Sequence, residues 1–343
     1  MNEQHTSPLA TLSLDLDDTW AYLRTRGEQD WSSAPSMLRP AVDRLLPLLE
    51  ELGLRITVFV VGADAERPDG VAAIQALADA GHEIASHSWL HRADLASLPV
   101  TAIAEDLGRA TDAITAVTRA RPIGFRCPSF GSSPALLEAL VDGGFRYDAS
   151  VLPTSLSPLL KVYYRTRMRD GAAGQGSNDL FGPVSNAMRP LTPFRWVSGD
   201  LAMLELPVST VPLVRTPMHM SYVQALAEVS EPLSRAYLGG ALWALHARGV
   251  PASFLLHPTD LVDERDAPRL GFFPGMRRPA AEKVLSVRWA LQQLAASYDV
   301  MPLCAAAARL EGSRLPLRTP GVLFPVRAAS LPDRAEVSAE GVR

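Results

Sequence analysis

The stretch Arg55-Ile-Thr-Val-Phe-Val-Val61 is apolar and β-branched along nearly its whole length. Such a run is typical of a strand buried on both faces of a parallel sheet. Before it come a shorter apolar run, Thr11–Leu16, and a helical pattern over 38–52 that closes at Gly53, a residue type common just after a helix. Strand, helix and strand in this order predict a βα unit.

The same alternation continues to about residue 303. We expect helices over 71–80, 100–120, 134–142, 222–248 (one or two helices) and 282–296, and strands over 82–86, 123–125, 201–206, 252–256 and 300–303. This alternation indicates an α/β fold of parallel βα units, as a sheet or a barrel.

Three segments fall outside this rhythm. Residues 153–199 are rich in Pro, Gly, Ser, Arg and aromatic residues and predict a long irregular insertion. Residues 311–343 have no periodicity and predict a poorly ordered tail, and residues 1–10 form a polar N-terminal tail. The expected folded unit is therefore 11–310.

The chain has 343 residues, 47% hydrophobic and 20% charged, enough for one large α/β domain or two small ones. The net charge of -4 argues against a nucleic-acid partner. Cys127 and Cys304 are far apart in apolar surroundings, which favours two thiols in a reducing compartment over a disulfide. Residues 1–10 lack the features of a signal peptide, and no apolar run approaches the roughly 20 residues that span a bilayer. We expect a soluble, cytoplasmic protein.

Three carboxylates stand close together in Asp15-Leu-Asp17-Asp18-Thr19, directly after the first expected strand. Like charges this close repel one another, so the segment predicts a nearby cation. The ordinary alternative is that acidic residues are also common at strand ends and helix N-caps.

Histidines are concentrated in His82-Glu-Ile-Ala-Ser-His87-Ser-Trp-Leu-His91. His87 and His91 are four residues apart, so on a helical turn they would face the same way, as in a two-histidine metal site. A pair of this kind is more often incidental than a ligand pair. His82-Glu83 begins like the zinc-protease motif, but the next histidine comes five residues later instead of four, which excludes that motif.

Two further polar residues also follow expected strands. Arg126 lies in Gly124-Phe-Arg-Cys-Pro-Ser-Phe-Gly131, and His257 follows Ser253-Phe-Leu-Leu256. In parallel βα architectures the carboxyl ends of the strands meet at one edge, where catalytic residues converge. We therefore expect the acidic segment, His87, Arg126 and His257 to meet there.

With these motifs in this order, the sequence resembles the polysaccharide deacetylase family, the family-four carbohydrate esterases, from about residue 12 to 303. The family's Asp-Asp pair is matched by Asp17-Asp18, its His-(Ser/Thr)-x-x-His motif by His87 to His91, and its Arg-x-Pro motif by Arg126 to Pro128. Its Leu-x-His strand end is matched by Leu255-Leu-His257.

The resemblance implies a fold, a distorted (β/α) barrel of parallel strands, and a role for each matched residue. By resemblance Asp18, His87 and His91 hold one divalent metal ion, which we expect to be zinc. Asp17 is the general base that Arg126 pairs with and orients, and His257 donates a proton to the departing amine. We expect the substrate to contact Pro128, Ser129, Phe130 and Glu205, with a backbone N–H near Ser129 helping to stabilise the oxyanion.

The sequence also departs from the family pattern. Thr19 replaces the usual glycine after the Asp pair. The Asp-x-Trp motif that orients the catalytic histidine is not visible, which leaves Asp200 or Glu205 for that role. The insertion at 153–199 matches nothing common to the family, and its Tyr163, Tyr164, Phe181, Phe194 and Trp196, with Arg165, Arg167 and Arg169, could form a wall for a glycolipid or glycoconjugate.

The expected function is hydrolysis of a non-peptide amide bond, namely N-deacetylation of an amino sugar in a polysaccharide, glycoconjugate or glycolipid. A deformylase or a cyclic-amide hydrolase on the same fold is the alternative, and peripheral contact with a membrane stays open. A haloacid-dehalogenase-like phosphatase, with Asp15 as nucleophile and Asp17 as acid/base, is a more distant alternative. That mechanism needs a lysine, and the chain offers only Lys161 and Lys283.

Overall fold

The computed structural model describes residues 8–158 and 184–320. The strands are β1 Leu9–Leu16, β2 Thr57–Val60, β3 Glu83–Ser86, β4 Gly124–Phe125, β5 Tyr147–Asp148, β6 Phe194–Ser198, β7 Leu201–Glu205, β8 Ala252–Leu256, β9 Asp299–Met301 and β10 Leu317–Arg318. The helices are α1 Thr19–Arg26, α2 Leu38–Glu51, α3 Pro68–Asp79, α4 Val100–Thr118, α5 Pro134–Asp142, α7 Met220–Val229, α8 Glu231–His246, α9 Ala280–Ser297 and α10 Leu303–Arg309.

β1 lies in the interior of the sheet. It pairs in parallel with β2, where Leu14 faces Val58, and with β8, where Leu12 faces Phe254. Both faces of β1 are covered, which explains why its leucines and its polar residues are buried alike. Because β1, β2 and β8 run in the same direction, their carboxyl ends meet at one edge of the sheet.

The strand order is β10-β6-β7-β5-β4-β3-β2-β1-β8, with β9 paired to the start of β1. The pairs are parallel except for β6–β7, which is antiparallel. Within the described residues no strand ladder joins β8 to the other end of this path, so the sheet stays open. One short bridge crosses that gap: the N–H of Ser209 donates to the carbonyl oxygen of Ser253, and the N–H of Ser253 donates to the Ser209 hydroxyl at 2.8 Å. The fold is the expected α/β type, and this bridge takes the place of a closing ladder.

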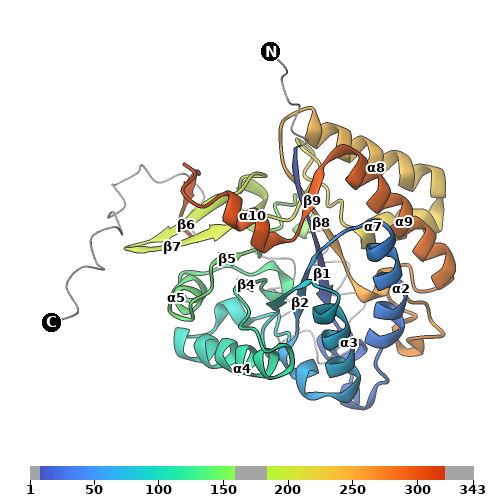
Figure 1. The fold of residues 1–343 in the computed structure, drawn as a ribbon, viewed down its shortest axis with the longest axis horizontal. Coiled ribbons are helices and arrows are strands. Elements are labelled where there is room, and N and C mark those ends of the chain that lie inside the picture. The colour runs from blue at the N-terminus through green and yellow to red at the C-terminus, as the bar shows by residue number, and fades with distance from the viewer. Residues whose placement is uncertain (1–7, 159–183, 321–343) are drawn as a thin grey trace.

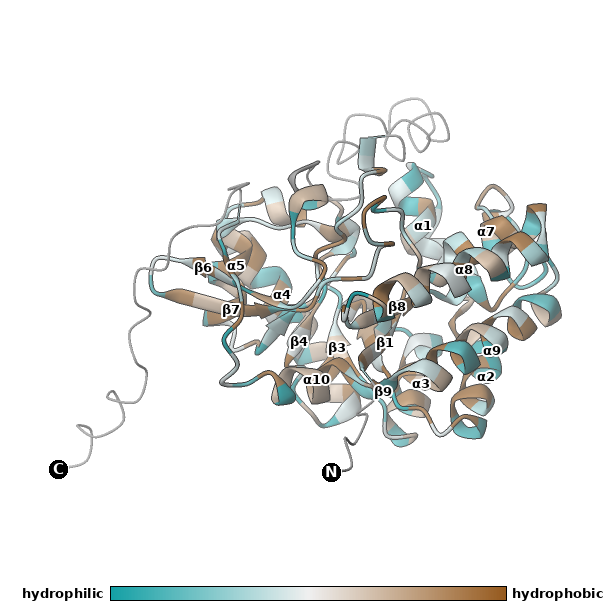
Figure 2. Cartoon of the chain, turned by 90° about the horizontal axis from the view of Figure 1, so that it is seen from above, coloured by the Kyte–Doolittle hydropathy of each residue, from teal (hydrophilic) through white to brown (hydrophobic). Residues whose placement is uncertain are grey.

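Helices cover the sheet in two groups. Figure 1 shows α2, α3, α8 and α9 gathered beside β1 and β8, with α4 and α5 beside β4 and β5. The first group encloses the largest core, in which Leu45 and Leu49 of α2 and Leu291 of α9 are fully buried. In Figure 2, β7 and β8 are largely hydrophobic, whereas the outer turns of the helices carry hydrophilic residues. This pattern is typical of helices that each bury one face.

The end of the expected irregular insertion is regular in the structure. Phe194 and Trp196 of β6 alternate inward, are buried, and pack edge to face with ring centroids 4.7 Å apart. The prediction that these two aromatic rings help to wall a substrate site was therefore wrong, since the core already holds them. β10 lies inside the expected tail and pairs with β6. The remaining aromatic residues and the arginines of the predicted wall (Tyr163, Tyr164, Arg165, Arg167, Arg169 and Phe181) lie outside the described residues.

The two cysteines carry free thiols, with Cys127 buried and Cys304 half-buried. In the ranges that the structure describes, no helix combines the length and the hydropathy needed to cross a bilayer.

Candidate metal and catalytic centre

Polar side chains from four strand ends converge at the carboxyl edge of the sheet. Asp15 and Asp17 lie at the end of β1, His87 follows β3, Arg126 follows β4 and His257 follows β8. Arg126 Nη1 lies 2.5 Å from Asp15 Oδ1, and His257 Nε2 lies 3.9 Å from Asp15 Oδ2. Parallel strands place these residues together although they are far apart in the sequence.

The metal-type cluster consists of Asp17, His87 and His91, whose candidate ligand atoms all lie within 4.8 Å of one another. Asp17 Oδ1 is 3.6 Å from His87 Nε2 and 3.4 Å from His91 Nε2. The same oxygen is buried and has no hydrogen-bond partner, which is costly unless a cation satisfies it. These atoms therefore fit a divalent ion.

The protonation of the two histidines suits such an ion. Burial lowers the pKa of His87 and lowers that of His91 to about 4, so both rings are neutral near pH 7 and keep a lone pair. His87 Nδ1 lies 2.7 Å from the carbonyl oxygen of Arg126, an acceptor, which assigns the ring proton to Nδ1. The lone pair of His87 then lies on Nε2, facing Asp17. A backbone carbonyl that orients a ligand histidine in this way is common at metal sites.

His87 and His91 are presented by a turn, whereas the sequence analysis considered a helical turn. Ser88 and His91 adopt left-handed backbone conformations, with φ of 67° and 51°. The Ser88 hydroxyl accepts the N–H of His91 at 3.0 Å, and Asp106 accepts the N–H of Trp89 at 2.8 Å. These two side-chain acceptors stabilise the turn and bring the rings to a centroid separation of 5.1 Å.

Asp18 is not part of the cluster, in contrast to the expectation that it would join His87 and His91. It is the N-cap of α1, and its carboxylate accepts the N–H of Thr19 at 2.7 Å and that of Met37 at 2.9 Å. Side chains alternate in extended chain, so Asp17 continues the face of Asp15 while Asp18 turns away to begin the helix.

Arg126 pairs with Asp15 and not with Asp17, which corrects the pairing implied by the resemblance. The guanidinium is fully buried and also donates to the carbonyl oxygen of Ala149 at 2.9 Å and to the Ser13 hydroxyl at 3.0 Å. Burial disfavours the charge on Asp15, but Arg126, with His87 and His257, outweighs burial and holds the pKa of Asp15 below its usual value. Burial raises the pKa of Asp17, against the opposing effects of His87 and His257. Asp15 is thus the more readily ionised carboxylate in the protein without a metal.

His257 has partners that the sequence analysis missed. Its Nδ1 lies 3.1 Å from the hydroxyl of Ser221, and its backbone N–H donates to Asp260 Oδ2 at 2.8 Å. The ring of His219 lies close by, with a centroid distance of 5.6 Å. His219 and Ser221 stand at the start of α7, and the only signal in the sequence was the beginning of the helical pattern near residue 222.

The two residues considered for orienting His257 lie elsewhere. Asp200 is exposed in the turn between β6 and β7. Glu205 is fully buried, accepts the N–H of Val151 and the Nε1–H of Trp196 at 2.8 Å each, and has a pKa raised well above its usual value by burial and by nearby Asp148. Glu205 is thus held inside the fold, which also argues against the expected contact with substrate.

The loop after Arg126 contains the other expected substrate contacts. Pro128, Ser129 and Phe130 form a short 3₁₀ turn in which Ser129 and Phe130 are left-handed, with φ of 59° and 60°. Phe130 packs against a small apolar cluster that includes Leu255 of β8, and its carbonyl oxygen accepts the side-chain amide of Asn186 at 3.2 Å. This strained loop therefore lies beside Arg126 at the carboxyl edge, where its role in binding stays a prediction.

Comparison with known proteins identifies this arrangement. The family model described as polysaccharide deacetylase matches residues 16–147, the part that carries Asp17, His87, His91 and Arg126. Residues 16–147 belong to the polysaccharide deacetylase family. The resemblance drawn from the motifs is thereby confirmed.

Relatives of this chain match different shares of it. It is 27% identical to a peptidoglycan deacetylase of Helicobacter pylori over 59% of the chain and 65% of that protein. It is 30% identical to a peptidoglycan deacetylase-like protein of Gibberella zeae over 36% of each. The chain thus spans less than two thirds of the length of either relative.

A solved structure of a polysaccharide deacetylase homologue from Mycobacterium smegmatis superposes with a TM-score of 0.55 at 19% identity, covering 94% of this chain and 99% of the other. At this identity the match supports the fold alone, and it does so over nearly the whole chain.

Proposed function

We propose that this protein removes an N-acyl group from an amino sugar in a polysaccharide, glycoconjugate or glycolipid, using one divalent metal ion held by Asp17, His87 and His91. The observation that carries the proposal is the buried, unpartnered Asp17 Oδ1 between two neutral histidine nitrogens. Two imidazoles and one carboxylate suit zinc. When bound, such an ion polarises the acyl carbonyl and makes a nearby water more acidic.

We assign the general base to Asp15, where the resemblance alone had assigned it to Asp17. Asp15 Oδ1 is paired with Arg126, and the lowered pKa keeps the carboxylate ionised near neutral pH. An ionised, buried and oriented carboxylate can take the proton of the attacking water. The buried Arg126 also fixes the direction of that carboxylate through its bonds to Ala149 and Ser13.

His257 is the proposed acid. Its Nε2 lies on the side of Asp15, at 3.9 Å from Oδ2, and its side chain is partly accessible at 16%. A proton held on that nitrogen can pass to the departing amine, whose protonation is required for the carbon–nitrogen bond to break. With Asp15 as the base and His257 as the acid, the two proton-transfer groups lie next to each other at the carboxyl edge of the sheet.

The phosphatase alternative finds no support around Asp15. Its partner is an arginine, and Lys283 is buried elsewhere, donating to the carbonyl oxygens of Thr259 and Val262. Lys161 lies outside the described residues. The phosphatase reading also gives no role to His87 and His91, which face Asp17.

A panel assay tests the proposed function. Purified protein, stripped of metal and reconstituted with zinc, is incubated with N-acetylglucosamine oligomers, peptidoglycan fragments, an N-formyl sugar and a cyclic ureide, and the released acid or opened ring is measured. We expect zinc-dependent acetate release from at least one N-acetyl sugar. Turnover of the formyl or cyclic substrate alone would favour the alternative bond, and turnover of none with zinc bound would contradict the proposal.

A further inference from the structure

The hydroxyl of Ser221 lies between the ring of His257 and the carboxylate of Asp260. Ser221 Oγ is 3.1 Å from His257 Nδ1. Burial raises the pKa of the Asp260 carboxyl group, and a hydrogen bond from the Ser221 side chain is among the interactions that oppose this rise. Asp260 is buried, with 1% exposure, and its Oδ2 also accepts the backbone N–H of His257 at 2.8 Å. The carboxylate, the hydroxyl and the imidazole thus form a continuous chain that leads to Asp15.

The number of protons available decides which group donates in each of these hydrogen bonds. A serine hydroxyl has one proton and two lone pairs. When it donates to the Asp260 carboxylate, it can only accept from the ring, so the Nδ1 of His257 carries a hydrogen. In the capping box that opens the 3₁₀ turn Pro258–Asp260, the His257 side chain is also placed to accept the N–H of Asp260. That N–H donates to the carbonyl oxygen of His257 at 2.9 Å, so we take Ser221 as the partner of Nδ1.

The first turn of α7 is tied to the turn that carries Asp260. Gln224, one helical turn after Ser221, donates to the backbone carbonyl of Asp260 at 3.2 Å and to that of Lys283 at 3.1 Å. Ser221 and Gln224 therefore approach Asp260 from the same face of the helix. The position of the hydroxyl is set by this contact as well as by the hydrogen bonds of Ser221 itself.

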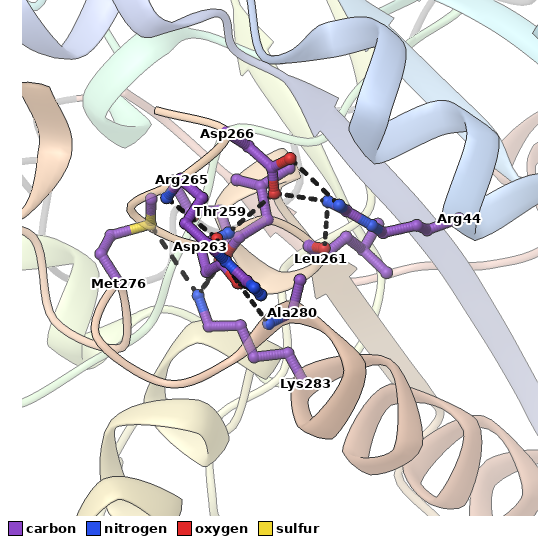
Figure 3. Close-up of polar contacts among 10 residues, drawn as sticks. Arg44, Thr259, Leu261, Asp263, Arg265, Asp266, Met276, Ala280 and Lys283 are labelled. Carbon is purple, nitrogen blue, oxygen red and sulfur yellow. Dashed lines mark hydrogen bonds and ion pairs between the residues drawn. The ribbon is translucent and has the colours of Figure 1, made fainter. Parts of the chain in front are cut away.

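Lys283 and Arg44 hold the segment around Asp260 in place. Lys283 Nζ donates to the carbonyl oxygens of Thr259 and Val262, at 2.6 and 2.8 Å, on either side of Asp260 in the chain. Figure 3 shows Lys283 beside Thr259. In the same view Arg44 of α2 binds Asp266, with Nη1 at 2.6 Å from Oδ2. The contacts of Lys283 hold the backbone on either side of Asp260 and so limit the movement of its carboxyl group.

We propose that Ser221 is the positioning residue of His257: its hydroxyl connects the ring to Asp260, keeps a hydrogen on Nδ1 and leaves Nε2 as the nitrogen that exchanges protons beside Asp15. The inference rests on the proposed function for its catalytic consequence, but not for the hydrogen bond itself. In this protein the ring of His257 is thus supported through a hydroxyl group that belongs to helix α7.

Kinetics test the catalytic consequence. Ser221→Ala removes the bridge, and we expect kcat for acyl release to fall about 10- to 100-fold with KM within about twofold of the parent. Ser221→Thr keeps a hydroxyl and should recover most of the lost kcat. Ser234→Ala is the matched control, because the buried hydroxyl of Ser234, in α8, donates to the carbonyl of Val223, in α7, rather than to His257. A loss in Ser234→Ala equal to that in Ser221→Ala would mean that packing of α7, and not the bridge, matters.

Magnetic resonance of the full chain tests the bridge without substrate. With ¹⁵N-labelled histidine, we expect His257 to show a protonated Nδ1 and a slowly exchanging Nδ1 proton, and we expect Ser221→Ala to lose that slow exchange while Ser221→Thr keeps it. A neutral ring protonated only at Nε2, or a spectrum unchanged in Ser221→Ala, would overturn the proposal. Because this readout needs no turnover, an inactive protein with the expected spectrum would contradict the proposed function and leave the bridge standing.

Discussion

Arg126 and Asp15 form a buried ion pair, 2.5 Å between Nη1 and Oδ1, with side-chain exposures of 0% and 3%. The pair distinguishes Asp15 of β1 from Asp17, the residue that follows β1. Asp15 has its charge balanced by Arg126, whereas the buried Oδ1 of Asp17 has no hydrogen-bond partner and lies beside the two neutral histidines. A carboxylate whose charge is paired within the protein suits proton transfer, and one whose charge is unpaired suits binding of a cation.

The first prediction concerns Asp15. We expect Asp15→Asn to lower kcat about 10²- to 10⁴-fold, because a positioned base is lost, while the variant still binds one equivalent of metal. Steady-state acyl release and elemental analysis of the same preparation measure both. A variant with parental turnover would place the base elsewhere.

The second prediction separates Asp17 from Asp18. Asp17→Ala and His91→Ala should each lose bound zinc, since each removes one of three ligands. Asp18→Ala should retain it, because its carboxylate caps a helix instead. Metal content after dialysis against a weak chelator gives the answer. Loss of metal in Asp18→Ala together with retention in Asp17→Ala would restore the assignment made from the resemblance.

The third prediction concerns stability. Asp18→Ala leaves the N–H groups of Thr19 and Met37 without their acceptor, and we expect the free energy of unfolding to fall by about 1–3 kcal/mol. Urea unfolding of the metal-free proteins measures this difference. Asp18→Asn, which keeps an acceptor oxygen, serves as the control and should lose less. Equal midpoints for Asp18→Ala and the parent would show that the cap contributes nothing.

The fold was largely predictable because many of its strands and helices coincide with apolar runs or helical patterns in the sequence. The segment 55–61 and the helical pattern over 38–52 correspond to β2 and α2, whose burial depends on spacing that the sequence displays. Helix α1 was missed because its polar sequence has no apolar stripe and depends on the Asp18 cap. β6 was missed because the Pro- and Gly-rich sequence around it hides a short alternation that becomes a strand only by pairing with β7.

The site was predictable as a set of strand ends but not in its detail. The sequence gives no way to tell which of three neighbouring carboxylates faces the histidines, since that depends on where β1 ends and α1 begins. The family's adjacent Asp pair pointed to Asp17 and Asp18, whereas in the structure the alternating residues Asp15 and Asp17 face Arg126 and the two histidines. The contact of Ser221 with His257 could not be predicted from the sequence, because it is tertiary packing that brings α7 to His257.

The fourth prediction is a dependence of stability on pH. Burial, with Arg55 nearby, lowers the pKa of His82 from 6.5 to about 4. Between these values the unfolded chain takes up a proton that the folded protein refuses, so stability is present above pH 6.5 and falls as pH drops toward 4. We expect His82 to contribute about 1–2 kcal/mol to this fall, after allowance for solvent screening.

His82→Asn isolates that contribution. Asparagine can keep an acceptor near the backbone N–H of Ile56, 3.4 Å from His82 Nδ1, without titrating. Unfolding free energies at pH 7 and pH 4.5 should therefore differ less in the variant than in the parent. The same pH dependence in both proteins would assign the effect to other histidines.

Anomalous diffraction from crystals soaked in zinc tests the central claim most directly. We predict one strong peak within coordination distance of Asp17, His87 Nε2 and His91 Nε2, with Asp18 still bonded to the N–H groups of Thr19 and Met37. A peak coordinated by Asp18 in place of Asp17, or no peak at this edge in a crystal that binds zinc elsewhere, would contradict the account.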